Sequence, residues 1–314
     1  MRDENKFLVV VDGSYFMYFT LFGAVTEFQK KYAEESSVWI KPPEECDQNN
    51  LPNLLNCATF VKVLKRFVMK RLETVDSIVR QNFQDEIDSV NRIDFVFAMD
   101  DRLKHNFRLA LYPQYKAHRA LVKRSYQVQV IKDYIIDVIF KEIDIEDSYG
   151  YRLVKVEGAE GDDVVATLLT KFKDKYVGTA LIASDHDFLQ IDGIREFDLF
   201  GREAKRTLGD EEVSANDFLL GKILMGDKSD NIQQVFMRCG PKTALRLVKN
   251  KDALKNMLRE SQESSERFKL NKKIISFSEI PNDLTERIMK TVNETLYRND
   301  VLNPKVDLRD FMLM

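Results

Sequence analysis

The sequence predicts an α/β protein built on a central, mainly parallel sheet, with a helical region toward the C-terminus. Three short, nearly continuous apolar runs are typical of strands buried on both faces: Phe7–Val11, Ile93–Met99 and Thr179–Ser184. Longer stretches separate these runs, and their apolar residues recur with helical spacing. Beyond Gly201 the pattern is mainly helical. We therefore expect an α/β unit over residues 1–200 and a helical unit over residues 201–314.

The remaining elements follow in chain order. Tyr151–Val156 alternates like a strand, and Glu196–Phe200 is a candidate for a further one. Prolines and asparagines between about residues 34 and 53 predict a loop or insertion, and Gln262–Glu266 is a polar break. Helices are expected at Tyr15–Phe28, Leu54–Asn82, Gln129–Ile143, Phe218–Met225 and Leu284–Tyr297, and directly after Gly161 and Pro241.

The composition is that of an ordinary globular protein: 314 residues, 44% of them apolar and 32% charged, with a net charge of −3. This net charge gives no sign of a nucleic-acid partner, although binding depends on local patches rather than on the total. Three cysteines at unrelated spacings match neither a disulfide framework nor a zinc motif. No signal-peptide pattern and no long apolar run is present, so we expect a cytoplasmic protein that does not contact a membrane.

Carboxylates follow each of the first four predicted strands: Asp12; Asp100 and Asp101; Glu160, Asp162 and Asp163; Asp185 and Asp187. Acids at the start of a helix often serve only to stabilise that start, but this does not explain their recurrence at four strand ends. Because the carboxyl ends of parallel strands meet at one edge of a sheet, we expect these acids to converge. Asp227 and Asp230, at i and i+3, would share a helix face if their segment is helical.

Such a cluster of carboxylates requires neutralisation. Like charges roughly 4 Å apart repel by about 4 kcal/mol at an effective dielectric constant near 20, so either pKa values rise or cations bind. Ligands that are all oxygen atoms suit Mg²⁺ or Mn²⁺. Two such ions roughly 3.5–4 Å apart clamp the attacking and leaving oxygens of a phosphodiester and generate the hydroxide. The acids therefore predict a metal centre suited to phosphodiester hydrolysis.

The segment from Arg102 to Arg124 has a different character from the rest of the chain. Seven basic residues are interleaved with aromatic residues there, and no acid is present. Solvated basic faces are common in proteins, so such a patch alone does not identify a ligand. Its mixture of cations and aromatic rings fits a nucleic acid.

These motifs, in this order, resemble the structure-specific 5′ nucleases, which are the flap endonucleases and 5′–3′ exonucleases. The most distinctive is Met225–Ile232, which carries Gly-Asp-x-x-Asp-Asn. Phe268–Met289 is similar to the bacteriophage ribonuclease H branch of this family. The resemblance spans roughly residues 7–250. The other matching segments are Val10–Gly13, Asp100, Phe107–Arg108, Tyr115–Arg119, Glu160–Asp163 with Gly in place of the family's Ala, and Ser184–Asp187.

The resemblance implies a PIN-like domain with a basic helical arch at about residues 102–130, and a C-terminal DNA-binding region with a helix-three-turn-helix-like motif. It implies a metal-dependent 5′–3′ exonuclease or flap endonuclease that removes RNA primers and flaps in replication. The cofactor would be two or more Mg²⁺ ions, with Mn²⁺ as a substitute. The substrates would be DNA and RNA–DNA hybrids with a free 5′ end. A single-stranded DNA-binding protein or a clamp would be a partner of this monomer, in the host cytoplasm if the chain comes from a bacteriophage.

The resemblance also assigns residues by position. Lys116 and Arg119 would steer the scissile phosphate and stabilise its charge, and Asp163 completes the implied catalytic set. Asp100 is preferred to Asp101 as a ligand because it follows the strand directly, and the choice stays open. The implied metal ligands are Asp12, Asp100, Glu160, Asp162, Asp163, Asp185, Asp187, Asp227 and Asp230. The implied nucleic-acid contacts are Arg108, Tyr112, Tyr115, Lys116, Arg119, Lys123, Arg124, Lys242 and Arg246.

Several alternatives stay open. Val235–Lys242 keeps one of the two glycines that the helix-three-turn-helix normally carries, so its duplex contacts and its potassium ion stay undecided. The chain could be a PIN-type ribonuclease acting on RNA, or a non-catalytic protein that binds nucleic-acid junctions. A full set of acids argues against the second, because a pure binder has no need of their repulsion. A nuclease domain that continues into a polymerase domain is disfavoured because the chain stops at Met314.

Overall fold

The computed structural model describes residues 6–101, 105–142 and 151–296. Five strands form one sheet in the order β3-β2-β1-β4-β5, and every neighbouring pair is parallel. The predicted parallel sheet is therefore confirmed, although its last strand ends at Phe197 rather than Phe200. The strands are β1 (Lys6–Asp12), β2 (Arg92–Met99), β3 (Tyr151–Lys155), β4 (Gly178–Ile182) and β5 (Arg195–Phe197).

The strand order determines where a ligand can bind. From β1 the chain adds β2 and β3 on one side, and it then crosses to the other side of β1 to add β4 and β5. The neighbouring carboxyl ends of β1 and β4 therefore lie where the direction of winding reverses. Open α/β sheets bind their ligands outside this point. Asp12, the last residue of β1, lies there.

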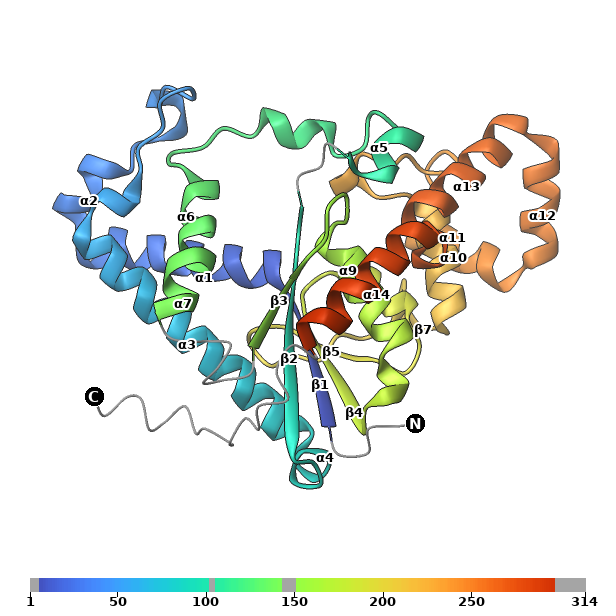
Figure 1. The fold of residues 1–314 in the computed structure, drawn as a ribbon. Coiled ribbons are helices and arrows are strands. Elements are labelled where there is room, and N and C mark those ends of the chain that lie inside the picture. The colour runs from blue at the N-terminus through green and yellow to red at the C-terminus, as the bar shows by residue number, and fades with distance from the viewer. Residues whose placement is uncertain (1–5, 102–104, 143–150, 297–314) are drawn as a thin grey trace.

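Helices cover both faces of the sheet (Figure 1). Successive residues of β1 alternate between two apolar cores, with Val9 and Val11 in the first and Leu8 and Val10 in the second. A continuous apolar strand is what burial on both faces requires. The first core is covered by α1 (Gly13–Lys31), α3 (Ala58–Asn82) and α6 (Val128–Tyr134), and the second by α9 (Gly161–Lys171) and α14 (Asn282–Leu296).

The insertion before α3 is more ordered than the sequence predicts. The expected loop over residues 34–53 begins with α2 (Ala33–Trp39), whose prediction as a loop is wrong. α3 begins at Ala58 rather than Leu54, because the side chain of Cys57 accepts a hydrogen bond from the Phe60 amide and caps the helix there. Short helical turns occupy Pro43–Glu45 and Leu54–Asn56.

A third apolar cluster holds the helices that follow the sheet. The predicted break at Gln262–Glu266 is wrong, because these residues form the first turns of a helix that Ser261 caps. The last helix, α14, packs against β3 and α9 rather than with this group. The group consists of α10 (Ala215–Met225), α11 (Pro241–Lys249), α12 (Lys251–Glu260) and α13 (Gln262–Ile275), beside the two-stranded hairpin of β6 (Thr207–Leu208) and β7 (Glu211–Glu212).

The remaining elements are short. The helix expected over Gln129–Ile143 is present as α6, a wider helical turn at Ile135–Ile139, and α7 (Phe140–Glu142), and Ile143 lies outside the described residues. No helix in the described part of the chain is long and apolar enough to span a bilayer. The other short elements are α4 (Gln84–Asp88), α5 (Phe107–Leu111) and helical turns at Ala117–Leu121, Lys173–Lys175, His186–Gln190, Lys228–Asp230 and Phe277–Glu279.

Candidate active site

Asp12 ends the central strand and starts the first helix. Its carboxylate accepts a hydrogen bond of 3.0 Å from the Tyr15 amide and so caps α1. Gly13 follows because β2 passes too close for any side chain: a Cβ there would lie 2.6 Å from the carbonyl oxygen of Ala98. Burial, together with the nearby charges of Asp100 and Asp185, raises the pKa of Asp12 to about 7. Asp12 is therefore a buried acid that other acids surround.

Asp100, and not Asp101, faces Asp12 across the end of the sheet. The Gly161 amide at the start of α9 donates a hydrogen bond of 2.7 Å to Asp100 Oδ1, and the Ser14 hydroxyl donates one to Oδ2. Asp101 instead lies 3.6 Å from the ammonium group of Lys155. Asp100 thus connects the ends of β1, β2 and β3.

Asp163 is held inside the protein by a guanidinium group. Arg108 Nη2 donates to Asp163 Oδ1 at 2.8 Å, and Nη1 donates to Oδ2 at 3.1 Å and to Glu160 Oε2 at 3.2 Å. The Glu160 amide also donates to Asp163 Oδ2 at 3.0 Å. Asp163 is fully buried and Arg108 is 3% exposed. This geometry disagrees with two expectations: Asp163 is not open to a metal or a substrate, and Arg108 does not face a nucleic acid.

The basic segment docks onto the remaining acids from above the sheet. The Tyr115 hydroxyl donates to Glu160 Oε2 at 2.9 Å, and Lys116 forms a short ion pair with the other oxygen of Glu160. Lys116 also lies 3.8 Å from Asp230, to which Arg119 donates a hydrogen bond of 2.8 Å. These contacts join residues more than 40 positions apart. The structure therefore brings the expected basic and acidic residues together, although Lys116 and Tyr115 are themselves buried.

Asp227 and Asp230 do not share a helix face, so that expectation is wrong. Their motif turns back on itself, with backbone hydrogen bonds in both directions between Asp227 and Ile232. Gly226 opens this turn with φ 64°, and a Cβ there would lie 2.5 Å from two carbonyl oxygens, so only glycine fits. Asp227 consequently points toward Lys222, whereas Asp230 points toward Lys116 and Arg119.

Lys222 is a functional candidate that the sequence analysis missed. Its ammonium group lies 2.6 Å from Asp187 Oδ1 and 3.1 Å from Asp227 Oδ2, and so bridges two predicted ligands. Burial and the charge of Asp185 raise the pKa of Asp187 to about 7, although Lys222 opposes the shift. A lysine one turn before the Gly-Asp-x-x-Asp-Asn motif was the available signal.

Glu196 is the second residue that the sequence analysis missed. It lies on β5, is 2% exposed, and neither carboxylate oxygen has a hydrogen-bond partner within the described ranges. Burial, together with the charges of Asp185, Asp12 and Asp187, raises the pKa of Glu196 to about 8. Its position in the candidate strand Glu196–Phe200 was the signal that the sequence offered.

The donor set suits a hard divalent cation. Asp12, Asp162 and Asp185 form no ion pair with a side chain in the described part of the chain, and the pKa of Asp162 is raised by burial and then by Asp185 and Asp12. Together with the unpaired oxygens of Glu196, they provide carboxyl oxygens that no side-chain cation occupies in the described part of the chain. Among the described residues, however, no three Asp, Glu, His or Cys side chains converge closely enough to hold an ion as they stand. Ammonium and guanidinium groups instead occupy Glu160, Asp163, Asp187 and Asp230.

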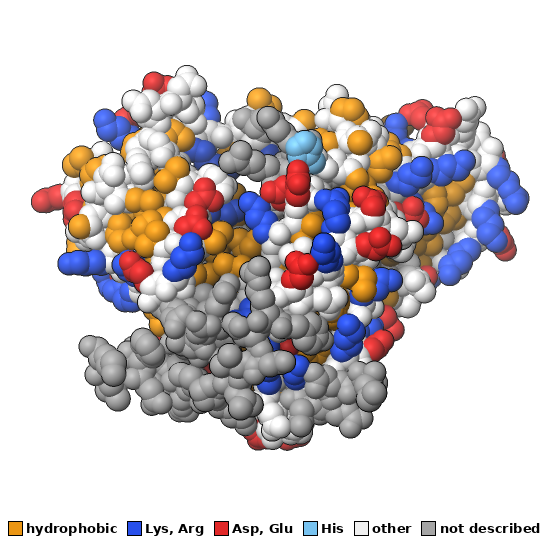
Figure 2. Space-filling model, viewed as in Figure 1, with side chains coloured by type: hydrophobic (Ala, Val, Ile, Leu, Met, Phe, Trp, Pro, Cys, Tyr) orange, Lys and Arg blue, Asp and Glu red, His pale blue; other side chains and the backbone are white. Residues whose placement is uncertain are grey.

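The other predicted nucleic-acid contacts lie around this cluster or apart from it. The Tyr112 hydroxyl donates to the carbonyl oxygen of Asn231 at 3.1 Å. Lys123 is exposed, and Arg124 is partly buried beside the insertion. Lys242 and Arg246 are exposed on α11. Figure 2 shows further Lys and Arg side chains gathered over the region of α12 and α13, so basic surface continues through the helical group.

Comparison with known proteins identifies relatives over part of the chain. Residues 70–216 match the family model described as the 5′-3′ exonuclease, N-terminal resolvase-like domain. A 5′-3′ exonuclease of Buchnera aphidicola subsp. Schizaphis graminum is 28% identical over 191 residues, which cover 59% of this chain and 60% of that protein. Ribonuclease H of Enterobacteria phage T4 is 27% identical over 158 residues, which cover 46% and 51%. The chain thus spans less than two thirds of the length of these relatives.

Solved structures show the same fold. The T5 D15 protein co-crystallised with metal ions superimposes with a TM-score of 0.57 at 16% identity, covering 92% of this chain and 99% of that one. A T5 flap endonuclease pseudo-enzyme–product complex with DNA and metal ions gives a TM-score of 0.56 at 16% identity, covering 93% and 99%. The chain therefore has the α/β fold of the T5 exonuclease, and its residues 70–216 match the N-terminal resolvase-like domain of 5′-3′ exonucleases.

Proposed function

We propose that this chain is a divalent-metal-dependent 5′ nuclease, which hydrolyses phosphodiesters near the 5′ end or junction of flap, nicked or RNA-primed duplexes. The observation that carries the proposal is the group of Asp12, Asp162 and Asp185 at the switch point, where burial and the neighbouring carboxylates raise the pKa of Asp12 and of Asp162. The match to the 5′-3′ exonuclease model and the metal ions in the T5 structures support this class of reaction.

Mg²⁺, as two or more ions and with Mn²⁺ as a substitute, would lower the pKa of a bound water and offset the charge of the phosphodiester. Asp12, Asp162 and Asp185 would hold the cation, because their oxygens are not committed to side-chain cations. Asp187 would join them once Lys222 releases it. Asp163 would act indirectly, by fixing Arg108 and the start of α9.

Arg119 and Lys116 would have different parts in substrate binding. The Arg119 side chain is 52% exposed, so its pair with Asp230 contributes little stability and is easily exchanged for a phosphate. Lys116 is buried between Glu160 and Asp230, and there it lowers the repulsion that a phosphate would meet at this edge. Arg119 would therefore contact the phosphate directly, and Lys116 would complement its charge.

The path of the nucleic acid follows from the same arrangement. Residues 105–127 pass above the carboxyl edge of the sheet between α5 and α6 (Figure 1), and would form the basic arch of a PIN-like domain. Helices α10–α13, with exposed Lys242 and Arg246, would bind the duplex in the manner of a helix-three-turn-helix. We propose the units 1–200 and 201–314 on this basis, with α14 packed against the first.

The cellular role proposed from this activity is the removal of RNA primers and flaps during replication, on DNA and on RNA–DNA hybrids. A single-stranded DNA-binding protein or a clamp would be the partner of this monomer. Binding to either substrate should weaken steeply with salt, because phosphate contacts release counterions.

The proposal is tested with a 5′-labelled flap duplex. We expect cleavage near the junction with Mg²⁺ or Mn²⁺, none with EDTA, and a loss of at least about 100-fold for Asp12→Asn, the size of loss seen when one charge-stabilising catalytic group is removed. Asp283→Asn is the matched control, because that acid is 78% exposed and lies on α14, which carries none of the clustered acids. An uncut flap with either ion, or full activity of Asp12→Asn, would reject the proposal.

Two further outcomes separate the alternatives. Cleavage of single-stranded RNA with no cleavage of flap DNA would identify a PIN-type ribonuclease. Binding of a flap duplex without cleavage, together with a calorimetric titration that detects no Mg²⁺ binding, would identify a non-catalytic junction-binding protein.

A further inference from the structure

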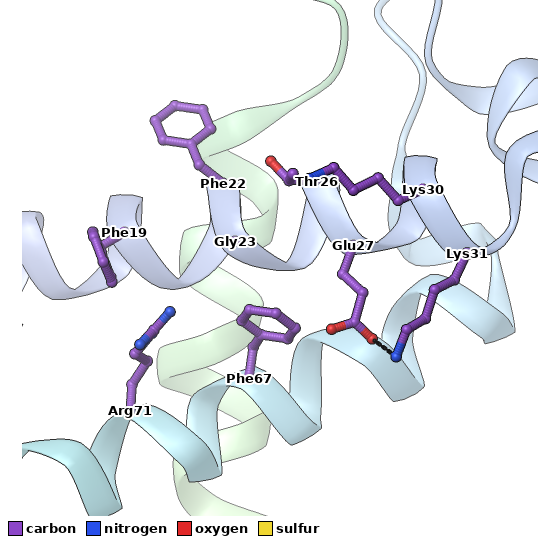
Figure 3. Close-up of a pocket in the computed structure, with 9 residues that line it drawn as sticks. All are labelled: Phe19, Phe22, Gly23, Thr26, Glu27, Lys30, Lys31, Phe67 and Arg71. Carbon is purple, nitrogen blue, oxygen red and sulfur yellow. Dashed lines mark ion pairs between the residues drawn. The ribbon is translucent and has the colours of Figure 1, made fainter. Parts of the chain in front are cut away.

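A groove between α1 and α3 is not used by the proposed reaction. Figure 3 shows Arg71 reaching from α3 toward α1, between Phe19 and Phe67, while Phe22 and Lys30 project from the opposite edge of α1. The groove encloses about 550 Å³. Gly23 lies between the two edges, and a Cβ there would lie 2.7 Å from the Phe67 ring, so glycine allows this ring to approach α1 closely.

Arg71 lacks an anionic partner. Its guanidinium carbon lies 4.5 Å from the centre of the Phe19 ring and 5.9 Å from that of Phe67. Its Nε is buried, and no hydrogen-bond partner for it occurs in the described ranges of the chain. Burial lowers the pKa of this guanidinium group. A buried donor with no acceptor is unfavourable, and an incoming anion would satisfy it.

The charge around the groove favours an anion as well. Glu27 is the single acid among the lining residues, and it already pairs with Lys31 at 3.0 Å and with Arg66. Lys30 and Arg71 remain as cations that no carboxylate neutralises within the described residues. The ligand of this groove should therefore combine planar apolar surface with negative charge.

The groove lies along the helix that Asp12 caps. Phe19 and Phe22 lie on this helix, on the two edges of the groove. Ten residues of helix separate Asp12 from Phe22, a distance of about 15 Å, which equals about four stacked nucleotides. Phe200, 66% exposed, packs edge-on against Phe19 with ring centres 5.2 Å apart and extends this aromatic surface.

We propose that this groove binds the single-stranded part of the nucleic-acid substrate, a few nucleotides from the acid cluster. Bases stack on the exposed rings of Phe22 and Phe200, and phosphates pair with Arg71 and Lys30. The inference rests on the proposed function, because it treats the strand that reaches the acids as the occupant. An acidic peptide with aromatic side chains has similar chemistry, but the position of the groove on the helix that Asp12 caps favours the strand.

The test measures binding of a fluorescent single-stranded oligonucleotide by anisotropy in EDTA, where no cleavage occurs. For the double variant Phe22→Ala/Lys30→Gln we expect an affinity about 5- to 100-fold weaker, the loss typical of one stacked base. The slope of log affinity against log salt should fall in magnitude by about 0.7, because one phosphate contact is removed. Both side chains are exposed, so the variant is expected to fold normally.

The matched control is Val177→Ala/Lys290→Gln, which also removes one exposed apolar side chain and one exposed cation, on β4's amino-terminal side and on α14. Arg71→Gln is the second variant, with its melting temperature measured because the residue is partly buried. Equal affinities and salt slopes for the wild type and both groove variants would overturn the inference.

The outcomes also separate this inference from the proposed function. If the wild type cuts the flap and the groove variants bind single strands unchanged, the inference fails and the nuclease proposal stands. If the wild type neither cuts nor binds, both fail. If the variants lose affinity only for an aromatic acidic peptide, the groove is a protein-binding site and the inference is again overturned.

Discussion

The guanidinium group of Arg108 and the carboxylate of Asp163 form a two-point ion pair in the interior, with N–O distances of 2.8 and 3.1 Å. The same guanidinium group reaches Glu160, and its Nε donates to the carbonyl oxygen of Ile274 at 2.9 Å. Arg108 thus ties the basic segment, the start of α9 and the end of α13 together.

Removing Arg108 should therefore destabilise the protein. We expect Arg108→Ala to lower the free energy of unfolding by about 3–5 kcal/mol, because it leaves the buried charge of Asp163 without its partner. Urea unfolding followed by circular dichroism measures the change. Arg119→Ala, which removes a half-exposed pair with Asp230, is the control and should cost about 1 kcal/mol or less. Equal losses for the two variants would contradict this account of Arg108.

Glu196 should make the stability of the metal-free protein depend on pH. Its pKa is about 8 in the folded protein and near 4.5 when unfolded, so the folded state binds the extra proton between these values. The contribution is fully present below about pH 4.5 and is lost as the pH rises through 8, at about 1.4 kcal/mol per unit of pKa difference. Glu196→Gln should remove this loss, so the variant gains stability over the wild type as the pH increases.

Urea unfolding in EDTA at pH 5, 7 and 9 measures this difference. Glu203→Gln is the control, because the side chain of Glu203 is 43% exposed and its pKa is lowered by Arg195 rather than raised. Wild-type and Glu196→Gln stabilities that stay parallel across the three pH values would show that Glu196 does not titrate in this range.

Lys222 should compete with divalent cations. Its ammonium group already neutralises Asp187 and Asp227, so Lys222→Gln should destabilise the metal-free protein and increase the stabilisation that Mg²⁺ provides. Melting temperatures with EDTA and with a Mg²⁺ series measure both effects. Lys173→Gln, which alters an exposed contact with the Asp192 carbonyl, should change neither. A Mg²⁺ response equal to that of the wild type would mean that the lysine does not occupy a cation site.

The insertion before α3 should hold one end of the basic segment. Gln48 exchanges two hydrogen bonds with the backbone of Arg124, at 2.9 and 3.0 Å, and the Gln127 amide donates to the Pro52 carbonyl at 3.0 Å. At about 0.5–1.5 kcal/mol per hydrogen bond, Gln48→Ala should speed amide hydrogen exchange near Arg124 several-fold. Mass spectrometry of the peptides over residues 117–127 measures this rate, with Gln262→Ala as the control. An unchanged rate would mean that the insertion does not restrain the segment.

The sheet was predictable because its determinants are local. A strand buried on both faces needs a continuous apolar run, and β1 is such a run, followed at once by Asp12 and Gly13. The convergence of acids at one edge followed from parallel strands alone. The position of α2 was not predictable in this way, because prolines and asparagines later in the same insertion masked a seven-residue helix.

The partners of the acids could not be predicted, because they depend on contacts between distant parts of the chain. Asp163 meets Arg108 from 55 residues away, and Arg119 meets Asp230 across 111 residues. No local pattern distinguishes an arginine that turns inward from one that faces solvent. Lys222 and Glu196 lie outside every motif, so only the folded arrangement shows that they adjoin the cluster.

Through Lys116, the attachment of the basic segment depends on whether Glu160 and Asp230 are bound to a cation. Its amide donates to the Asp230 carbonyl at 3.0 Å, and its ammonium group lies between Glu160 and Asp230. The carboxylate oxygens that hold the segment are therefore the same oxygens that would bind a cation. A cation that displaces Lys116 from Glu160 would therefore weaken the attachment of the segment. By thermodynamic reciprocity, the attached segment weakens the binding of the cation by the same free energy.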